Sequence, residues 1–227
     1  MSVAMIVFAK AMVVIPITLL PILNPIAIAP IFLSMTERMQ QGGANKLAKR
    51  IALHCFFLLM GAFFIGSYVL DFFGISLPIV QVGGGLVVAL AGWGMLSDKG
   101  QDQLPSTVAA SHEGDWSEDE LRRRSFYPIS FPLTVGPGAI AASITLGTQL
   151  PHKPVDWIIT SFASVLGVML TTLGIYLAYR FAGNLVRFLG DVGATVLLRL
   201  SAFILLCIGI EIGWTGLSDL IEQVKFH

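Results

Sequence analysis

Charged side chains are scarce in this sequence, and the few that are present cancel. Only 12% of the 227 residues are Asp, Glu, Lys or Arg, whereas 55% are hydrophobic and the mean hydropathy is +0.80. This composition excludes an ordinary soluble domain and indicates an integral membrane protein. The 14 Lys and Arg residues balance 14 Asp and Glu residues, and no basic tract is longer than residues 122–124. A nucleic-acid-binding surface is therefore not expected.

Cysteines and catalytic motifs are also rare. The two cysteines, Cys55 and Cys207, lie inside apolar runs, which fits buried free thiols better than a disulfide framework or a metal site. The glycine run at residues 83–85 is not followed by the Lys-Ser/Thr pair of a phosphate-binding loop. The sequence shows no Ser-His constellation, no paired intramembrane aspartates and no His-Glu metal motif. We therefore expect neither an enzyme nor a bound cofactor or metal.

Long uncharged stretches, by contrast, fill most of the chain. A helix needs about 20 apolar residues to cross the hydrocarbon core of a bilayer. Five stretches contain no charged residue, and a sixth is interrupted only by Arg199 and Glu211; they are residues 11–36, 51–70, 72–97, 125–152, 157–179 and 192–218. The sequence therefore predicts an all-α, polytopic membrane protein with six transmembrane spans.

The basic residues gather on one side of this predicted topology. The first, third and fifth connections hold Arg38, Lys46, Lys49, Arg50, Lys99, Arg122, Arg123, Arg124, Arg180 and Arg187, whereas the other side holds Lys10, Lys153 and Lys225. Because loops rich in Lys and Arg stay in the cytoplasm, both termini are predicted to be periplasmic. The long polar segment 98–124 is then a cytoplasmic loop. Ser117 and Glu120 within it form a capping-box pattern that predicts a short surface helix.

The two halves of the chain resemble each other. Residues 25–30 and 137–142 both begin with a proline that is followed, after one intervening residue, by the sequence Ala-Ile-Ala. Each segment belongs to the first span of a three-span block. Because three is odd, the second block enters the membrane from the opposite side, as in many secondary transporters. We therefore expect two inverted repeats, at residues 1–97 and 125–227, joined by the loop at residues 98–124.

Prolines concentrate in the first span of each block. Eight of the eleven prolines lie there: Pro16, Pro21, Pro25, Pro30, Pro128, Pro132, Pro137 and, at the very end of the second run, Pro151. Proline inside a helix removes a hydrogen bond and clashes with the preceding turn, and a broken backbone in hydrocarbon needs partners from protein or water. Asn24 before Pro25 suits the start of a new helix, and Gly136 before Pro137 repeats the arrangement. Both spans are therefore predicted to be discontinuous and to line a cavity.

Broken helices present unpaired backbone groups to a ligand. The N-terminus of a half-helix has free N–H groups and a partial positive charge, which suits a carboxylate, whereas the C-terminus presents carbonyl groups that suit an ammonium group. Gly138 adds a place where another group can approach the backbone closely. Two breaks in matching positions favour a substrate site. The alternative is that the prolines and glycines merely kink tightly packed spans.

The same motifs resemble the MarC family of bacterial inner-membrane proteins. The resemblance covers essentially the whole chain and rests on Asn24-Pro25-Ile26-Ala27, Pro30-Ile31-Phe32-Leu33, Phe72-Phe73-Gly74-Ile75-Ser76-Leu77-Pro78, Gly83-Gly84-Gly85-Leu86, Phe131-Pro132-Leu133-Thr134 and Gly136-Pro137-Gly138-Ala139-Ile140. It implies six spans with both ends periplasmic, in a family that includes transporters of small neutral amino acids such as glycine and alanine. The chain departs from the family pattern at Ala27, where the family usually has glycine, and at Glu211, near which family members tend to have an uncharged amide.

Together these observations predict a secondary transporter of glycine, alanine or serine that works by alternating access. The expected substrate-binding residues are Asn24, Pro25, Ile26, Ala27, Thr134, Gly136, Pro137 and Gly138. Glu211 is a candidate for ion coupling because an intramembrane carboxylate can carry a proton or pair with a cation; H⁺ and Na⁺ both remain open. The alternative function is a non-transporting membrane scaffold that uses the charged cytoplasmic loop as its interaction surface. The sequence does not indicate an oligomeric state.

Overall fold

A computed structural model of the chain describes residues 3–36, 39, 42–97, 118–151 and 154–225. Helices make up nearly all of this part, and it contains no strand. The helices are α1 (Val3–Leu23), α2 (Pro25–Thr36), α3 (Gly43–Phe72), α4 (Leu77–Ser97), α6 (Glu118–Arg124), η1 (Ser125–Thr134), α7 (Pro137–Thr148), α8 (Pro154–Arg180) and α9 (Ala182–Lys225). The prediction of an all-helical protein is confirmed.

Four helices of the described part are long and apolar enough to cross a membrane alone: α3, α4, α8 and residues 195–223 of α9. Two further pairs of shorter helices pass the same length and composition test only when each bent pair is taken as one span. These pairs are α1 with α2, bent by 52°, and Glu118–Thr134 with α7, bent by 72°. The structure therefore has four to six candidate spans, and the two bent pairs coincide with the two proline-rich runs.

The capping-box pattern correctly predicted a helix near Glu118, but Ser117 itself lies outside the described residues. The sequence analysis ended the polar loop at residue 124 and began a span at residue 125. In the structure the helical backbone of α6 runs through Arg124 into the start of η1, the hydroxyl of Ser125 donates to the carbonyl of Arg122 across that boundary, and the first non-helical residue is Tyr127. A charged turn of helix thus leads directly into the apolar segment.

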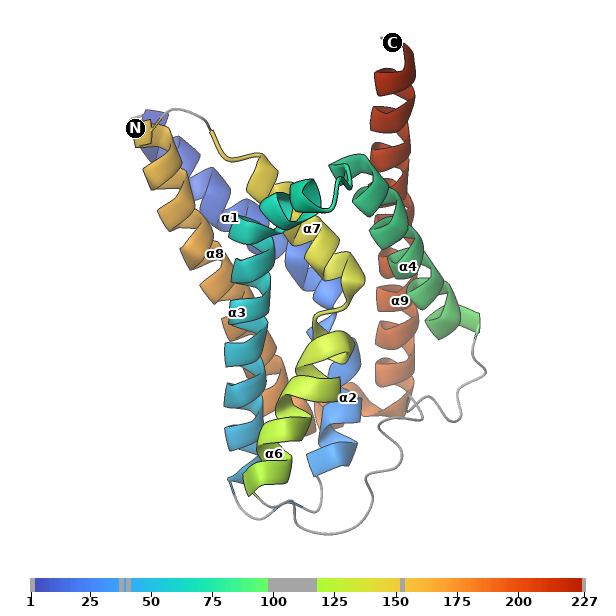
Figure 1. The fold of residues 1–227 in the computed structure, drawn as a ribbon. Coiled ribbons are helices and arrows are strands. Elements are labelled where there is room, and N and C mark those ends of the chain that lie inside the picture. The colour runs from blue at the N-terminus through green and yellow to red at the C-terminus, as the bar shows by residue number, and fades with distance from the viewer. Residues whose placement is uncertain (1–2, 37–38, 40–41, 98–117, 152–153, 226–227) are drawn as a thin grey trace.

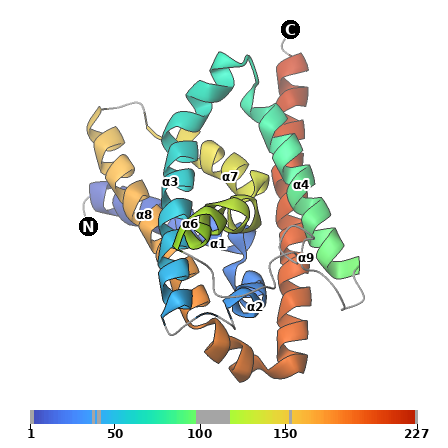
Figure 2. The ribbon, with the colours of Figure 1, turned by 60° about the horizontal axis from the view of Figure 1, so that its bottom comes forward.

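The helices form two groups with the second half-helix of each broken pair between them (Figure 1). In both views α1, α3 and α8 lie on one side, α4 and α9 lie on the other, and α2 and α7 are placed between the groups (Figure 2). The start of α1 and the end of α9 are at the same end of the molecule. Gly190 interrupts α9 with a φ of 62°, a left-handed conformation that glycine adopts without strain, and the chain turns there.

Glycines let α4 and α9 approach each other closely. A Cβ atom added to Gly85 would lie 2.4 Å from the backbone nitrogen of Gly213, and one added to Gly92 would lie 2.5 Å from that of Leu206. Side chains larger than hydrogen therefore cannot occupy these positions without moving the helices apart. The glycine run of α4 serves helix packing, and α4 with α9 forms one closely joined unit.

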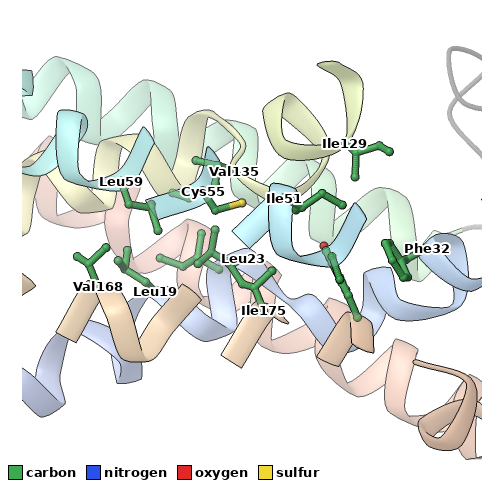
Figure 3. Packing of buried hydrophobic residues seen from close by; sticks show 14 of the residues in the cluster. Leu19, Leu23, Phe32, Ile51, Cys55, Leu59, Ile129, Val135, Val168 and Ile175 are labelled. Atoms are coloured by element: carbon green, nitrogen blue, oxygen red, sulfur yellow. The ribbon is translucent and has the colours of Figure 1, made fainter. Parts of the chain in front are cut away.

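The core lies where the two broken pairs meet α3 and α8. Figure 3 shows Leu19 and Leu23 of α1, Cys55 of α3 and Val135, which follows η1, within one buried cluster. Each of these four side chains has at most 1% of its surface exposed. The last residue of the first half-helix and the residue after η1 are therefore held in the same core.

Candidate functional site

The first break is a single residue long. α1 ends at Leu23, α2 begins at Pro25, and Asn24 between them has a φ of 44°. Asparagine tolerates this left-handed region better than most residues. The N–H of Asn24 still donates to the carbonyl of Leu20, at 2.9 Å, and its own carbonyl accepts from the N–H of Ala27, at 3.1 Å. The break predicted at Asn24 is therefore present, and it redirects the chain while keeping both half-helices wound to their ends.

The second break follows a wide, distorted turn. Within η1 the hydroxyls of Ser130 and Thr134 donate to carbonyls five residues earlier, at 2.5 and 2.8 Å. The N–H of Val135 also bonds five residues back, which is the spacing of a π-helix, a form often found at functional sites. Gly136 is then extended, with φ of −83° and ψ of 175°, and Pro137 begins α7. The break predicted at Gly136 is also present.

Tyr179 of α8 joins the two broken pairs. Its side chain is 1% exposed, and its hydroxyl lies 2.8 Å from the hydroxyl of Thr134 in η1. Because the Thr134 hydroxyl already donates to the carbonyl of Ile129, the phenol acts as the donor of this bond. The Tyr179 ring also stacks on Phe32 of α2, with centroids 4.8 Å apart and planes at 9°. One side chain therefore contacts both broken pairs.

A pocket of about 590 Å³ adjoins the first break. Its walls come from α1, α2, α8 and α9: Leu20, Pro21, Asn24, Pro25, Ile26, Gly174, Leu177, Ala178, Phe181, Leu185, Ser201 and Ile204. Only Asn24 and Ser201 contribute polar side chains, and no charged side chain lines it. The amide nitrogen of Asn24 is buried and has no hydrogen-bond partner among the described residues. An apolar pocket therefore adjoins a break that holds one buried, unused donor.

The predicted site residues divide into two groups. The structure places Asn24, Pro25 and Ile26 in the pocket wall. Thr134, Gly136, Pro137 and Gly138 are not among the lining residues of that pocket. Ala27 is 5% exposed and belongs to the buried residues of α2.

Gly138 does permit a close approach, but the group that approaches is a neighbouring helix. A Cβ atom at Gly138 would lie 1.8 Å from Cγ2 of Val88 in α4. Gly84 of α4 is similarly crowded by Ala141 of α7, at 2.6 Å. The second motif therefore fixes α7 tightly against α4 in this conformation.

Glu211 lies apart from both breaks. Its side chain is exposed on α9, and it is not among the residues that line the pocket at Asn24. Two contributors were missed by the sequence analysis: Tyr179, and the hydroxyl of Ser201 in the pocket wall. Both are single polar groups in apolar runs, and only their tertiary neighbours distinguish them from ordinary helix residues.

Comparison with known proteins agrees with the architecture. The family model described as "MarC family integral membrane protein" matches residues 9–221. The "UPF0056 inner membrane protein MarC" of Escherichia coli (strain K12) is 29% identical over 208 residues, which cover 91% of this chain and 93% of that protein. The protein of the same name from Shigella flexneri matches equally well. No solved structure matches the chain.

The family match covers far more than half of the chain and includes both breaks. The relatives are named inner-membrane proteins, in agreement with the long apolar helices of the structure. The resemblance found in the sequence motifs is confirmed, and the chain belongs to the MarC family of integral membrane proteins.

Proposed function

We propose that this protein is a secondary transporter of small neutral amino acids such as glycine, alanine and serine. The observation that carries the proposal is the pair of broken helices, whose ends at Leu23 and Val135 share one core while a pocket opens beside Asn24. Discontinuous helices that meet at a central site are the usual means by which secondary transporters bind polar substrates within a membrane. The chain then works by alternating access.

The pairing of helices supports an inverted repeat. In the proposed repeat, α1 and α2 correspond to η1 and α7, α3 corresponds to α8, and α4 corresponds to α9. Under this correspondence, the contacts that α1 and α2 make with α8 are matched by the contacts that η1 and α7 make with α3. The contact between α2 and α9 is likewise matched by the contact between α7 and α4. The pairs α3 with α8 and α4 with α9 each map onto themselves. The two broken pairs run in opposite directions (Figure 1).

The chemistry of the pocket favours a small, uncharged side chain on the substrate. The amide of Asn24 and the N–H of Ile26 at the start of α2 are suited to the carboxylate, and the last carbonyls of α1 are suited to the ammonium group. No charged side chain is available to neutralise a third charge. An amino acid such as lysine or glutamate would therefore lose hydration without a compensating partner.

The division of the helices into two groups supports a rocking motion. We propose that the α4–α9 unit rocks against α1, α3 and α8, with α2 and α7 between them. Thr134, Gly136, Pro137 and Gly138 then complete the site in a conformation in which α7 has moved relative to α4. In this proposal the coupling ion is H⁺ or Na⁺. Glu211 takes part in ion coupling if the flux of substrate depends on its side chain.

The proposed orientation follows the basic residues. Lys46, Lys49, Arg50 and Arg180 lie at the ends of α3 and α8 that are opposite the start of α1 and the end of α9 (Figure 1). With the basic end in the cytoplasm, both termini are periplasmic. Phe181 and Leu185 extend the pocket wall towards the same basic end. This conformation then faces the cytoplasm.

The experiment is a binding titration of the purified, detergent-solubilised protein with glycine, alanine, serine, lysine and glutamate. We expect heat of binding with the three neutral amino acids only. Asn24→Asp replaces the free donor with an anionic acceptor, so we expect affinity for glycine to fall at least tenfold. Asn184→Asp is the matched control, because the Asn184 carboxamide oxygen accepts from Arg187 on the exposed surface of α9 and an aspartate keeps that bond.

Two results would contradict the proposal: absence of binding by the unaltered protein, or equal affinities for glycine in Asn24→Asp and Asn184→Asp. The scaffold alternative is tested by deleting part of residues 99–120. A transporter keeps amino-acid binding and flux after this deletion, whereas a scaffold loses its activity.

A further inference from the structure

A second concavity lies on the outer surface between α3 and α8, with one wall residue from α1, and neither break lines it. It is a groove of about 760 Å³ lined by Met12, Lys49, Ala52, Leu53, Phe56, Leu166, Met169, Leu170, Thr172, Leu173 and Tyr176. Leu53, Met169, Leu170 and Leu173 are among the exposed large hydrophobic residues of the protein. The groove is therefore open to the surroundings and almost wholly apolar along its length.

One end of the groove is polar and positively charged. Lys49 and Tyr176 line this end. The hydroxyl of Tyr176 donates to the side-chain oxygen of Asn45, at 3.0 Å, and accepts from the guanidinium of Arg180. Arg180 also lies over the Tyr176 ring, 5.8 Å from its centroid. These contacts hold Arg180 at the same end of the groove as Lys49.

Among the described residues, the two cations lack the carboxylate partners that their neighbours have. Glu118 pairs with Lys46 at 3.3 Å and with Arg50 at 2.8 Å. Within the described part of the chain, neither Lys49 nor Arg180 takes part in an ion pair. Positive charge at this end of the groove is therefore available to an anionic ligand.

The length of the groove matches one leaflet of a bilayer. From Tyr176 to Leu166, both in its wall, α8 advances ten residues, or about 15 Å at the helical rise. This is about half of the ~30 Å thickness of the hydrocarbon core. An acyl chain that begins at the polar end would therefore follow the groove towards the middle of the membrane.

We propose that the α3–α8 groove is a binding site for one anionic phospholipid. The phosphate binds at Lys49 and Arg180, and an acyl chain lies along Ala52, Phe56 and Leu173. Basic pockets between transmembrane helices on the cytoplasmic side commonly select anionic headgroups in this way. Because α3 and α8 belong to different halves of the chain, the lipid bridges those halves. This inference does not depend on the identity of the transported substrate.

The test measures lipid retention by native mass spectrometry of the purified protein, titrated with dioleoyl phosphatidylglycerol or dioleoyl phosphatidylcholine. We expect preferential retention of phosphatidylglycerol. Lys49→Gln and Arg180→Gln are each expected to weaken its binding about fivefold, since each cation near a membrane surface contributes on the order of that factor. Lys46→Gln removes the same charge from the same end of α3, but from a residue paired with Glu118, and is expected to leave binding unchanged.

A groove-filling variant tests the acyl-chain half of the site without altering charge. Ala52→Phe is expected to weaken phosphatidylglycerol binding, while circular dichroism remains that of the unaltered protein. Soluble glycerol 3-phosphate is expected not to displace the lipid. The proposal is overturned by equal retention of the two lipids, by equal effects of Lys46→Gln and Lys49→Gln, or by displacement with glycerol 3-phosphate, which would indicate a simple anion site.

Discussion

The phenol of Tyr179 donates a hydrogen bond of 2.8 Å to the hydroxyl of Thr134, and this contact links the last turns of α8 to the turn before the second break. The Tyr179 ring also stacks on Phe32 of α2, the half-helix that follows the first break. Both broken helices are thus tied to one buried side chain. A shift of either half-helix relative to α8 must change one of these contacts.

This arrangement predicts which of two substitutions lowers the free energy of unfolding more. Tyr179→Phe removes the bond but leaves the Thr134 hydroxyl donating to Ile129, so we expect a loss of about 1 kcal/mol in the free energy of unfolding. Thr134→Val leaves a fully buried phenol without an acceptor, and we expect the larger loss, about 1 to 3 kcal/mol. Thermal unfolding in detergent measures both. Tyr68→Phe, on an exposed side chain, is the control, and a reversed order would contradict the bonding scheme.

The contact between Gly138 and Val88 predicts that a substitution at Val88 restores stability lost by a substitution at Gly138. A Cβ at position 138 would lie 1.8 Å from Cγ2 of Val88, so Gly138→Ala should lower the free energy of unfolding by about 1 to 3 kcal/mol. Val88→Ala removes the clashing atom, and the double variant should be more stable than Gly138→Ala alone. Gly83→Ala in α4 meets no atom within 4 Å and should not destabilise the protein. Additive losses in the double variant would show that the two residues are not in contact.

The left-handed backbone of Asn24 predicts different effects for two small replacements. Glycine at this position would keep the φ of 44° without strain, whereas alanine would not. We therefore expect Asn24→Ala to be less stable than Asn24→Gly by about 1 kcal/mol. Equal melting temperatures for the two variants would mean that the chain does not adopt this conformation at the break.

The ion pairs of Glu118 predict a pH-dependent contribution to stability. Hydrogen bonds from Arg50, and then from Lys46, lower the pKa of Glu118 from its ordinary value of 4.5; this residue is in the charged helix α6, before the apolar run of the second broken pair. Because the folded-state pKa is the lower one, the stabilisation is present above pH 4.5 and is lost as the pH falls through the folded value.

Glu118→Gln should therefore lower the melting temperature slightly at pH 7 in low salt, and the difference from the unaltered protein should vanish at acidic pH. The pair is exposed, so high salt should also remove the difference. Melting curves at several pH values and two salt concentrations check this. If the two melting temperatures still differ at a pH below the range in which carboxylates titrate, the effect of Glu118→Gln does not come from these ion pairs.

Local chemistry explains why the breaks were predictable. Asn24 with Pro25, and Gly136 with Pro137, are start signals for helices wherever they occur, because proline lacks an N–H and the preceding residue avoids the helical conformation. The end of the first half-helix at Leu23 follows from these residues alone. The helix at Glu118 was predictable for a similar local reason, although its continuity with η1 was not.

Tertiary contacts explain what the sequence could not provide. Tyr179 meets Thr134 across 45 positions of the chain, and nothing in its own segment identifies that partner. The pocket at Asn24 takes half of its wall from α8 and α9, so its apolar character depends on packing between distant helices. Gly138 was correctly expected to allow a close approach, but only the structure shows that Val88 is the approaching group.

The most direct test is countertransport of glycine in proteoliposomes. Vesicles containing the unaltered protein and preloaded with unlabelled glycine should accumulate external radiolabelled glycine faster than protein-free vesicles, and external alanine should compete. Vesicles with Asn24→Asp should accumulate little above the protein-free level, while those with Asn184→Asp should behave like the unaltered protein. Identical accumulation in vesicles with and without the unaltered protein would contradict the account.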